Sequence, residues 1–78
     1  SYSLSVIIPV YNEVELLGGA IRTIDAFVKQ HFSQYELVII ESGSTDGTGE
    51  LCDQLASELP SVRVIHEGAR NGFGSALK

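Results

Sequence analysis

Three short runs of apolar and β-branched residues constrain the fold of this chain more than any other feature. They read LSVIIPV at 4–10, YELVIIE at 35–41 and VRVIH at 62–66. Runs that are short and apolar almost throughout are typical of strands in a parallel sheet, which is covered on both faces. Pro9 cannot donate to a sheet ladder, so the first strand is expected to end near it or to lie at an edge.

Helical periodicity occupies the stretches between these runs. Apolar residues recur at steps of three and four over 17–31, which predicts an amphipathic helix of about four turns. Asn12, with Glu15 three residues later, predicts the N-cap and a capping box for that helix. A second helix is predicted over 51–59 and ended by Pro60.

The elements therefore alternate as β-α-β-α-β, and residues 75–78 read as the first turn of a third helix. Such alternation implies right-handed crossovers and a parallel sheet, which is an α/β fold. Residues 1–78 are long enough for no more than one small domain. The chain begins in a strand and ends at Lys78 without a stop signal, so we expect a truncated portion of a single domain.

Composition narrows the classes of partner. The net charge is −5 with five lysines and arginines, so no basic stripe is available for nucleic acid. Cys52 is the single cysteine, which rules out an internal disulfide, predicts a small buried apolar side chain and suits a reducing cytoplasm. No apolar stretch approaches the roughly 18 residues that a membrane span needs.

Ligands of open parallel sheets bind beyond the carboxyl ends of the strands. Three loops are expected there, at 11–13, 42–48 and 67–74. Tyr11 can pack against a flat base and Glu13 can accept hydrogen bonds from ring or ribose donors. Taken alone, the two residues equally suit a covered sheet end and a helix start.

The two later loops taken singly favour structural interpretations. The sequence SGSTDGT at 42–48 predicts a capped turn with Asp46 or Thr48 as N-cap, and it lacks the lysine of a P-loop. The loop at 67–74 is glycine-rich without a complete dinucleotide fingerprint. His66, at a strand end, is expected to be structural and is given no functional role.

The three loops together resemble family 2 glycosyltransferases. SVIIPVYNE at 5–13 resembles the family's opening S-V-I-I-P-x-Y-N-E. YELVIIESGSTDGT at 35–48 resembles its Y-E-(I/L)-(I/V)-x-V-D-D-G-S-T-D-G-T, and NGFGSAL at 71–77 resembles the stretch that comes next. The resemblance implies a GT-A fold, in which residues 1–78 form the first half of a three-layer, Rossmann-like parallel sheet.

The resemblance also implies a nucleoside pocket. The proline, tyrosine and glutamate of the first motif become Pro9, Tyr11 and Glu13, and the hydrophobic residue and second acid of the V-D-D run become Ile40 and Ser42. The family usually has aspartate where Ser42 stands. Serine is neutral and shorter, although its oxygen still accepts. Three alternatives therefore stay open: the base is held differently, a water bridges the gap, or the nucleotide is not the usual uridine.

The implied reaction is inverting transfer of a sugar from a nucleotide-diphosphate sugar to an acceptor that the sequence does not identify. Mg²⁺ or Mn²⁺ would neutralise the leaving group. In the family the metal site and catalytic base follow a fourth strand, so no catalytic or metal residue is expected within residues 1–78. We expect this portion to be inactive alone, and membrane association of the parent protein stays open.

Two other classes were weighed. Sugar nucleotidyltransferases share the sheet type but usually carry a glycine-rich, arginine-containing loop at 11–13, where this chain reads Tyr-Asn-Glu. A non-catalytic α/β module that binds a partner protein is the third class. In any of them, the missing neighbour of the first strand leaves an unpaired edge and an uncovered apolar face, which predicts self-association.

Overall fold

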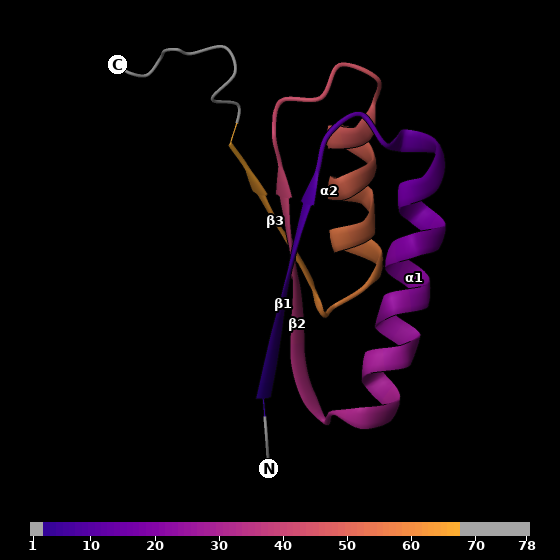
Figure 1. Cartoon of the computed structure of the whole chain (residues 1–78), viewed down its shortest axis with the longest axis vertical. Coiled ribbons are helices and arrows are strands. Elements are labelled where there is room, and N and C mark those ends of the chain that lie inside the picture. The colour runs from indigo at the N-terminus through magenta and orange to yellow at the C-terminus, as the bar shows by residue number, and fades with distance from the viewer. Residues whose placement is uncertain (1–2, 68–78) are drawn as a thin grey trace.

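The computed structural model describes residues 3–67, which contain three strands and two helices (Figure 1). In chain order these are β1 (Ser3–Val10), α1 (Val14–His31), β2 (Gln34–Glu41), α2 (Thr48–Glu58) and β3 (Val62–His66). The predicted order of elements is confirmed, with small differences in their bounds. The remainder of the predicted loop at 67–74 and the helix predicted from residue 75 lie outside the described residues.

The three strands form one parallel sheet in the order β1-β2-β3. Val6 of β1 is in register with Leu37 of β2, and Leu37 is in register with Val62 of β3. Both helices lie against the same face of this sheet (Figure 1). The α/β parallel sheet is therefore confirmed, and residues 3–67 contain two of the three layers of a Rossmann-like fold.

The apolar run at 4–10 is typical of a strand covered on both faces, whereas the missing neighbour of this strand predicts an uncovered apolar face. Among the described residues the uncovered face is confirmed. Alternate positions of β1 face the helices and become more buried towards Val10, whereas the positions between them are exposed. Ile7, on the other face, is 60% exposed. The reason is that both crossover helices pack on one side, so the second face of the sheet stays open.

The core lies between the sheet and the two helices. Ile21 of α1, Leu37 and Ile39 of β2, and Leu55 of α2 are fully buried there. Cys52 is also fully buried, and burial, followed by the charges of nearby carboxylates, raises the pKa of its thiol to about 11. The prediction that this cysteine acts as a small apolar residue is confirmed.

The helix starts differ from the predicted caps. The N-cap of α1 is Glu13, and Asn12 lies one residue earlier with a φ of 52°. Asn12 does not cap the helix because its side-chain oxygen accepts the backbone N–H of Thr45, 33 residues away. The N-cap of α2 is Gly47 rather than Asp46 or Thr48. Its φ of 93° is a conformation that glycine adopts at little cost.

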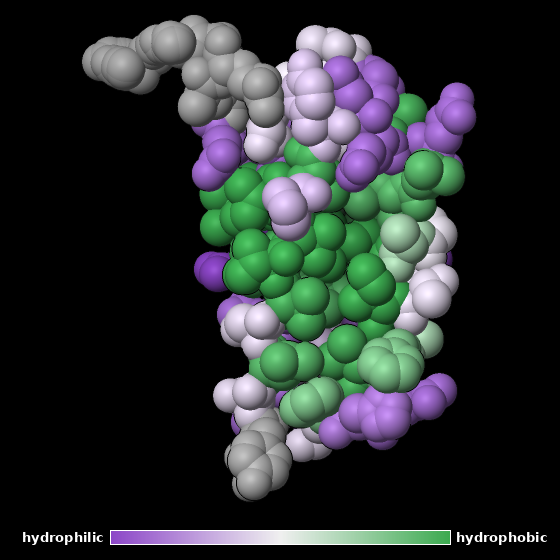
Figure 2. Space-filling view, in the orientation of Figure 1, coloured by the Kyte–Doolittle hydropathy of each residue, from purple (hydrophilic) through white to green (hydrophobic). Residues whose placement is uncertain are grey.

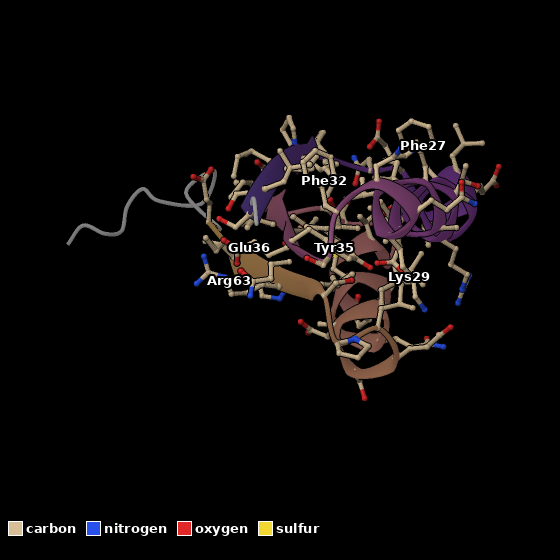
Figure 3. All side chains as sticks on the ribbon, turned by 90° about the horizontal axis from the view of Figure 1, so that it is seen from below. Phe27, Lys29, Phe32, Tyr35, Glu36 and Arg63 are labelled. Atoms are coloured by element: carbon tan, nitrogen blue, oxygen red, sulfur yellow. The ribbon has the colours of Figure 1, made fainter. Side chains whose placement is uncertain are left out.

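Polar side chains form hydrogen bonds and an ion pair at the amino-terminal half of the sheet. The hydroxyls of Tyr35 and Ser61 both donate to Asp25 Oδ1 of α1. On the open face, Glu36 of β2 accepts from the Ser5 hydroxyl (2.8 Å) and lies beside Arg63 of β3 (3.6 Å; Figure 3). The carboxyl-terminal half of the same face is apolar instead.

Candidate functional site

The carboxyl edge of the sheet brings two loops together, residues 11–13 after β1 and residues 42–47 after β2 (Figure 1). Three consecutive backbone N–H groups, of residues 12–14, donate to side chains within residues 44–48. The pairs are Asn12 to Ser44 Oγ (2.8 Å), Glu13 to Thr48 Oγ1 (2.9 Å) and Val14 to Asp46 Oδ2 (3.4 Å). The hydroxyl and acid groups of the second loop therefore fix the backbone of the first.

Asp46 organises the second loop from within. Its Oδ1 accepts the backbone N–H of Thr48 at 3.0 Å and also the Thr48 hydroxyl. Hydrogen bonding, first of all from that hydroxyl, lowers the pKa of Asp46. The carboxylate is therefore ionised at neutral pH, and it ties the loop to the start of α2.

Glu41, the last residue of β2, is buried with 4% of its surface exposed. Burial alone would raise its pKa, but the backbone N–H of Ser44 and the ring of His66 donate to the carboxylate and lower the pKa to about 2. Gly49 in the first turn of α2 lies beside this group, since a Cβ there would be in ordinary van der Waals contact with Glu41 Oε1, at 3.5 Å. The edge thus contains a buried, ionised carboxylate.

His66 ends β3 and lies between two carboxylates. Its Nδ1 is 3.0 Å from Glu41 Oε1, and its Nε2 is 2.7 Å from Asp53 Oδ1 of α2. The sequence analysis gave this histidine no role. The sequence feature that could have identified it is that Glu41 and His66 end two consecutive strands. In the structure these two residues are in register.

Several residues predicted from the resemblance meet on the open face at the same edge. Pro9 is in register with Ile40, and Ile40 is in register with Ile65 of β3, which the sequence analysis missed. Ser42 continues the ladder beyond Glu41, because its N–H donates to Val10 O at 3.3 Å. Pro9, Ile40 and Ile65 therefore form an apolar row across the strands, with Ser42 just beyond it.

Tyr11 and Glu13 follow directly after β1. Tyr11 is 44% exposed, and Glu13 is exposed while its carbonyl accepts the backbone N–H groups of Leu16 and Leu17. A pocket of about 390 Å³ opens beside them, lined by residues 12–16 and Asp46. Of the five predicted residues, this pocket includes Glu13 and excludes the other four.

Acidic residues gather at this edge, with Glu13 after β1, Glu41 at the end of β2 and Asp46 in the loop that follows. Hydrophilic residues gather over this end of the molecule (Figure 2). Two of the described arginines are paired with acids, Arg22 with Glu58 and Arg63 with Glu36. Within residues 3–67, no group of three histidine, cysteine, aspartate or glutamate side chains is arranged to hold a metal ion.

Comparison with known proteins decides the family. The family described as "Glycosyl transferase family 2" matches residues 5–78 of this chain. The chain belongs to glycosyl transferase family 2. The resemblance carried by the motifs at 5–13, 35–48 and 71–77 is thereby confirmed.

This family 2 chain has relatives in bacteria and archaea. It is 32% identical to Glycosyltransferase GlyG of Streptococcus pneumoniae, covering 94% of this chain and 23% of that protein. It is 36% identical to Undecaprenyl-phosphate mannosyltransferase of Micrococcus luteus, covering 90% and 27%. It is 33% identical to Glycosyltransferase AglD of Haloferax volcanii, covering 96% and 12%. The chain thus spans about a quarter or less of the length of each relative.

Proposed function

We propose that this chain is the nucleotide-sugar-binding half of an inverting glycosyltransferase and that the carboxyl edge of its sheet binds the donor nucleotide. The observation that carries the proposal is the register of Pro9 with Ile40, which brings Tyr11 and Ser42 to the same edge as the next residues along. Ligands of open α/β sheets bind at this edge. Membership of family 2 supports sugar transfer as the reaction of the whole protein.

Each residue has a distinct part in this proposal. The apolar row of Pro9, Ile40 and Ile65 offers a flat surface to a nucleotide base. The exposed ring of Tyr11 stacks on that base. The Ser42 hydroxyl accepts from the base, in place of the aspartate usual in the family. Glu13 accepts from ribose hydroxyls. The hydrogen bonds from loop 42–48 hold the backbone of this segment in place.

Metal and acceptor are assigned to no residue described here. Within residues 3–67 no group of three histidine, cysteine, aspartate or glutamate side chains is arranged to hold a metal ion, and we propose that the Mg²⁺ or Mn²⁺ of the parent protein is bound by residues that are not among these 78. We propose that residues 1–78 alone bind the donor without transferring sugar. Neither helix in the described part of the chain is long and apolar enough to cross a membrane.

We also propose a class of acceptor and a location for the whole protein. The Micrococcus luteus relative is named for undecaprenyl phosphate, so a polyprenyl phosphate belongs among the acceptors to assay with the whole protein. A cytoplasmic location is proposed because the single cysteine, Cys52, is a buried free thiol and no disulfide is needed.

Replacing Tyr11 by alanine is expected to weaken nucleotide binding. Stacking of a base on an aromatic ring contributes about 1–3 kcal/mol, which corresponds to a roughly 5- to 150-fold higher Kd. The measurement is isothermal titration of the whole protein that contains residues 1–78 with UDP, GDP, CDP and dTDP. Glycosyl transfer from the matching nucleotide sugar is then assayed with the nucleotide that binds.

Phe27→Ala is the matched control, because Phe27 is another exposed aromatic residue, 63% exposed on α1 and packed on His31. It is expected to leave every Kd unchanged. Binding of none of the four nucleotides by the intact protein would refute the proposed function. Equal Kd values for Tyr11→Ala and wild type would remove Tyr11 from the site.

We further propose that the isolated 78-residue chain associates with a second copy through β1. Among the described residues β1 has no strand on its outer side, and a broad hydrophobic surface borders it (Figure 2). Unpaired edge strands pair with other chains, and an edge lysine opposes this.

Light scattering is expected to show dimers or larger species that Ile7→Lys reduces. Leu16→Lys, at a 76% exposed site on α1, is the control. A monomeric wild-type chain would contradict this proposal.

A further inference from the structure

Both ring nitrogens of His66 face a carboxylate, Glu41 on one side at 3.0 Å and Asp53 on the other at 2.7 Å. A neutral imidazole carries one N–H, whereas an ionised carboxylate only accepts. Both contacts are therefore hydrogen bonds only when both ring nitrogens carry a proton. The geometry selects the positively charged form of His66.

Glu41 carries this arrangement onward to the loops of the site. Its second oxygen, Oε2, accepts the backbone N–H of Ser44. The hydroxyl of Ser44 in turn accepts the backbone N–H of Asn12 at 2.8 Å. Asn12 stands between Tyr11 and Glu13 and has a left-handed backbone conformation, which asparagine adopts more readily than most residues. An unbroken series of hydrogen bonds thus leads from the end of β3 to the segment that follows β1.

We propose that His66 is a positioning residue for the donor nucleotide: its protonated ring fixes Glu41, through which loop 42–48 holds the segment that carries Tyr11 and Glu13. This inference rests on the function proposed for that segment. Loss of the ring proton leaves one of the two carboxylates facing a lone pair instead of a donor. The loss is unfavourable where that carboxylate is Glu41, whose side chain is only 5% exposed. The loop then loses one of its fixed points, and donor affinity falls as the pH rises.

The surroundings of His66 agree with a change near neutral pH. The groups that face it within residues 3–67 are Asp53 from α2 and Glu41 from β2, and in that order they raise its pKa above the ordinary 6.5. The thiol of Cys52, on the same helix as Asp53, has a pKa of about 11 and stays neutral. Glu67 follows His66, and its backbone N–H donates to Glu41 O. His66 is thus the group of this cluster that loses its charge as the pH rises through its raised pKa.

The test is titration of the whole protein with UDP and GDP at about pH 6 and about pH 8.5. For the wild type we expect roughly tenfold weaker binding at the higher pH, within the range of ordinary coupling between sites. His66→Gln is expected to bind weakly at both pH values. His31→Gln is the matched control, since His31 lies exposed in the last turn of α1, and it should keep the wild-type pH dependence.

Asp53→Asn provides a second variant that leaves Glu41 in place. The side chain of Asp53 is 65% exposed, so the change is tolerated by the fold, and it is expected to move the pH midpoint of binding downward. Amide NMR spectra at about pH 6 should show shifted Ser44 and Asn12 signals in both variants with an unchanged core. Should His66→Gln unfold, Asp53→Asn decides the question alone.

Two outcomes overturn the inference in distinguishable ways. Equal wild-type affinity at both pH values, or a midpoint that Asp53→Asn does not move, would remove His66 from donor positioning and leave the proposed function standing. Absence of UDP and GDP binding at either pH, together with failure of the other nucleotides, would refute both.

Discussion

Ile39→Ala is expected to lower the free energy of unfolding by about 2–5 kcal/mol, the range for truncating a buried isoleucine. Ile39 is fully buried in β2, the central strand of the described sheet, and belongs to the core that both helices cover. Native proteins are stable by only about 5–15 kcal/mol, and a chain this short lies at the low end. The variant is therefore expected to keep a stability of about 3 kcal/mol or less.

Ile7→Ala is the matched control for this experiment, because it removes the same atoms from the same sheet. Ile7 is 60% exposed on the face that neither helix covers, so the loss is expected to stay within about 0.5 kcal/mol. Urea denaturation followed by circular dichroism measures both values, at a concentration where the chain is monomeric. Equal losses for the two variants would mean that the two faces of the sheet are equally buried.

The contrast between Ile39 and Ile7 shows how far the sequence predicts the fold. Apolar runs identified all three strands, because β-branched residues gather wherever a strand passes through a core. An uncovered face was expected from the missing neighbour of the first strand, but the apolar runs do not show which residues lie on it, since an isoleucine has the same identity on either face. Which face is covered depends on where the crossover helices pack, and this becomes visible only in three dimensions (Figure 1).

The helix starts show where local reasoning fails. Asparagine is a common N-cap residue, yet the side chain of Asn12 accepts a hydrogen bond from the backbone N–H of Thr45, far along the chain. Gly47 takes the cap position of α2 because the turn needs a positive φ. Local rules rank only the partners within a few residues, whereas these loops are fixed by partners from the neighbouring strand. The long-range hydrogen bonds that make the predicted caps wrong are also the ones that hold the loops of the candidate site together.

The site was predictable to the extent that parallel strands end at one edge. Pro9 and Ile40 were placed together correctly, because their strands pair in register. Glu41 and His66 also end neighbouring strands. The position of His66 between Glu41 and Asp53, however, depends on the exact register of the two strands, which the spacing of apolar residues does not determine. A histidine between two acids is recognised from geometry and not from spacing.

Glu41 is expected to give the strongest pH dependence of stability in acid. Its pKa is lowered from 4.5 to about 2, and each unit of difference between folded and unfolded states corresponds to about 1.4 kcal/mol. A group whose folded pKa is depressed stabilises the fold above its unfolded pKa and loses this contribution as the pH falls through the folded value. We therefore expect about 3 kcal/mol to be present above about pH 4.5 and to be lost towards pH 2.

Glu41→Gln isolates this contribution from the titration of other acids. The variant is expected to be less stable than the wild type near pH 6, and the difference should close as the pH falls towards 2, because the wild-type carboxyl is then protonated as well. Thermal unfolding across this range measures the difference. Glu50→Gln, which changes an exposed acid in the first turn of α2, should follow the wild type at every pH. A constant difference between Glu41→Gln and wild type from pH 6 to pH 2 would show that Glu41 acts through packing and not through its charge, and the carboxylate bonds to Ser44 and His66 would then contribute nothing to stability.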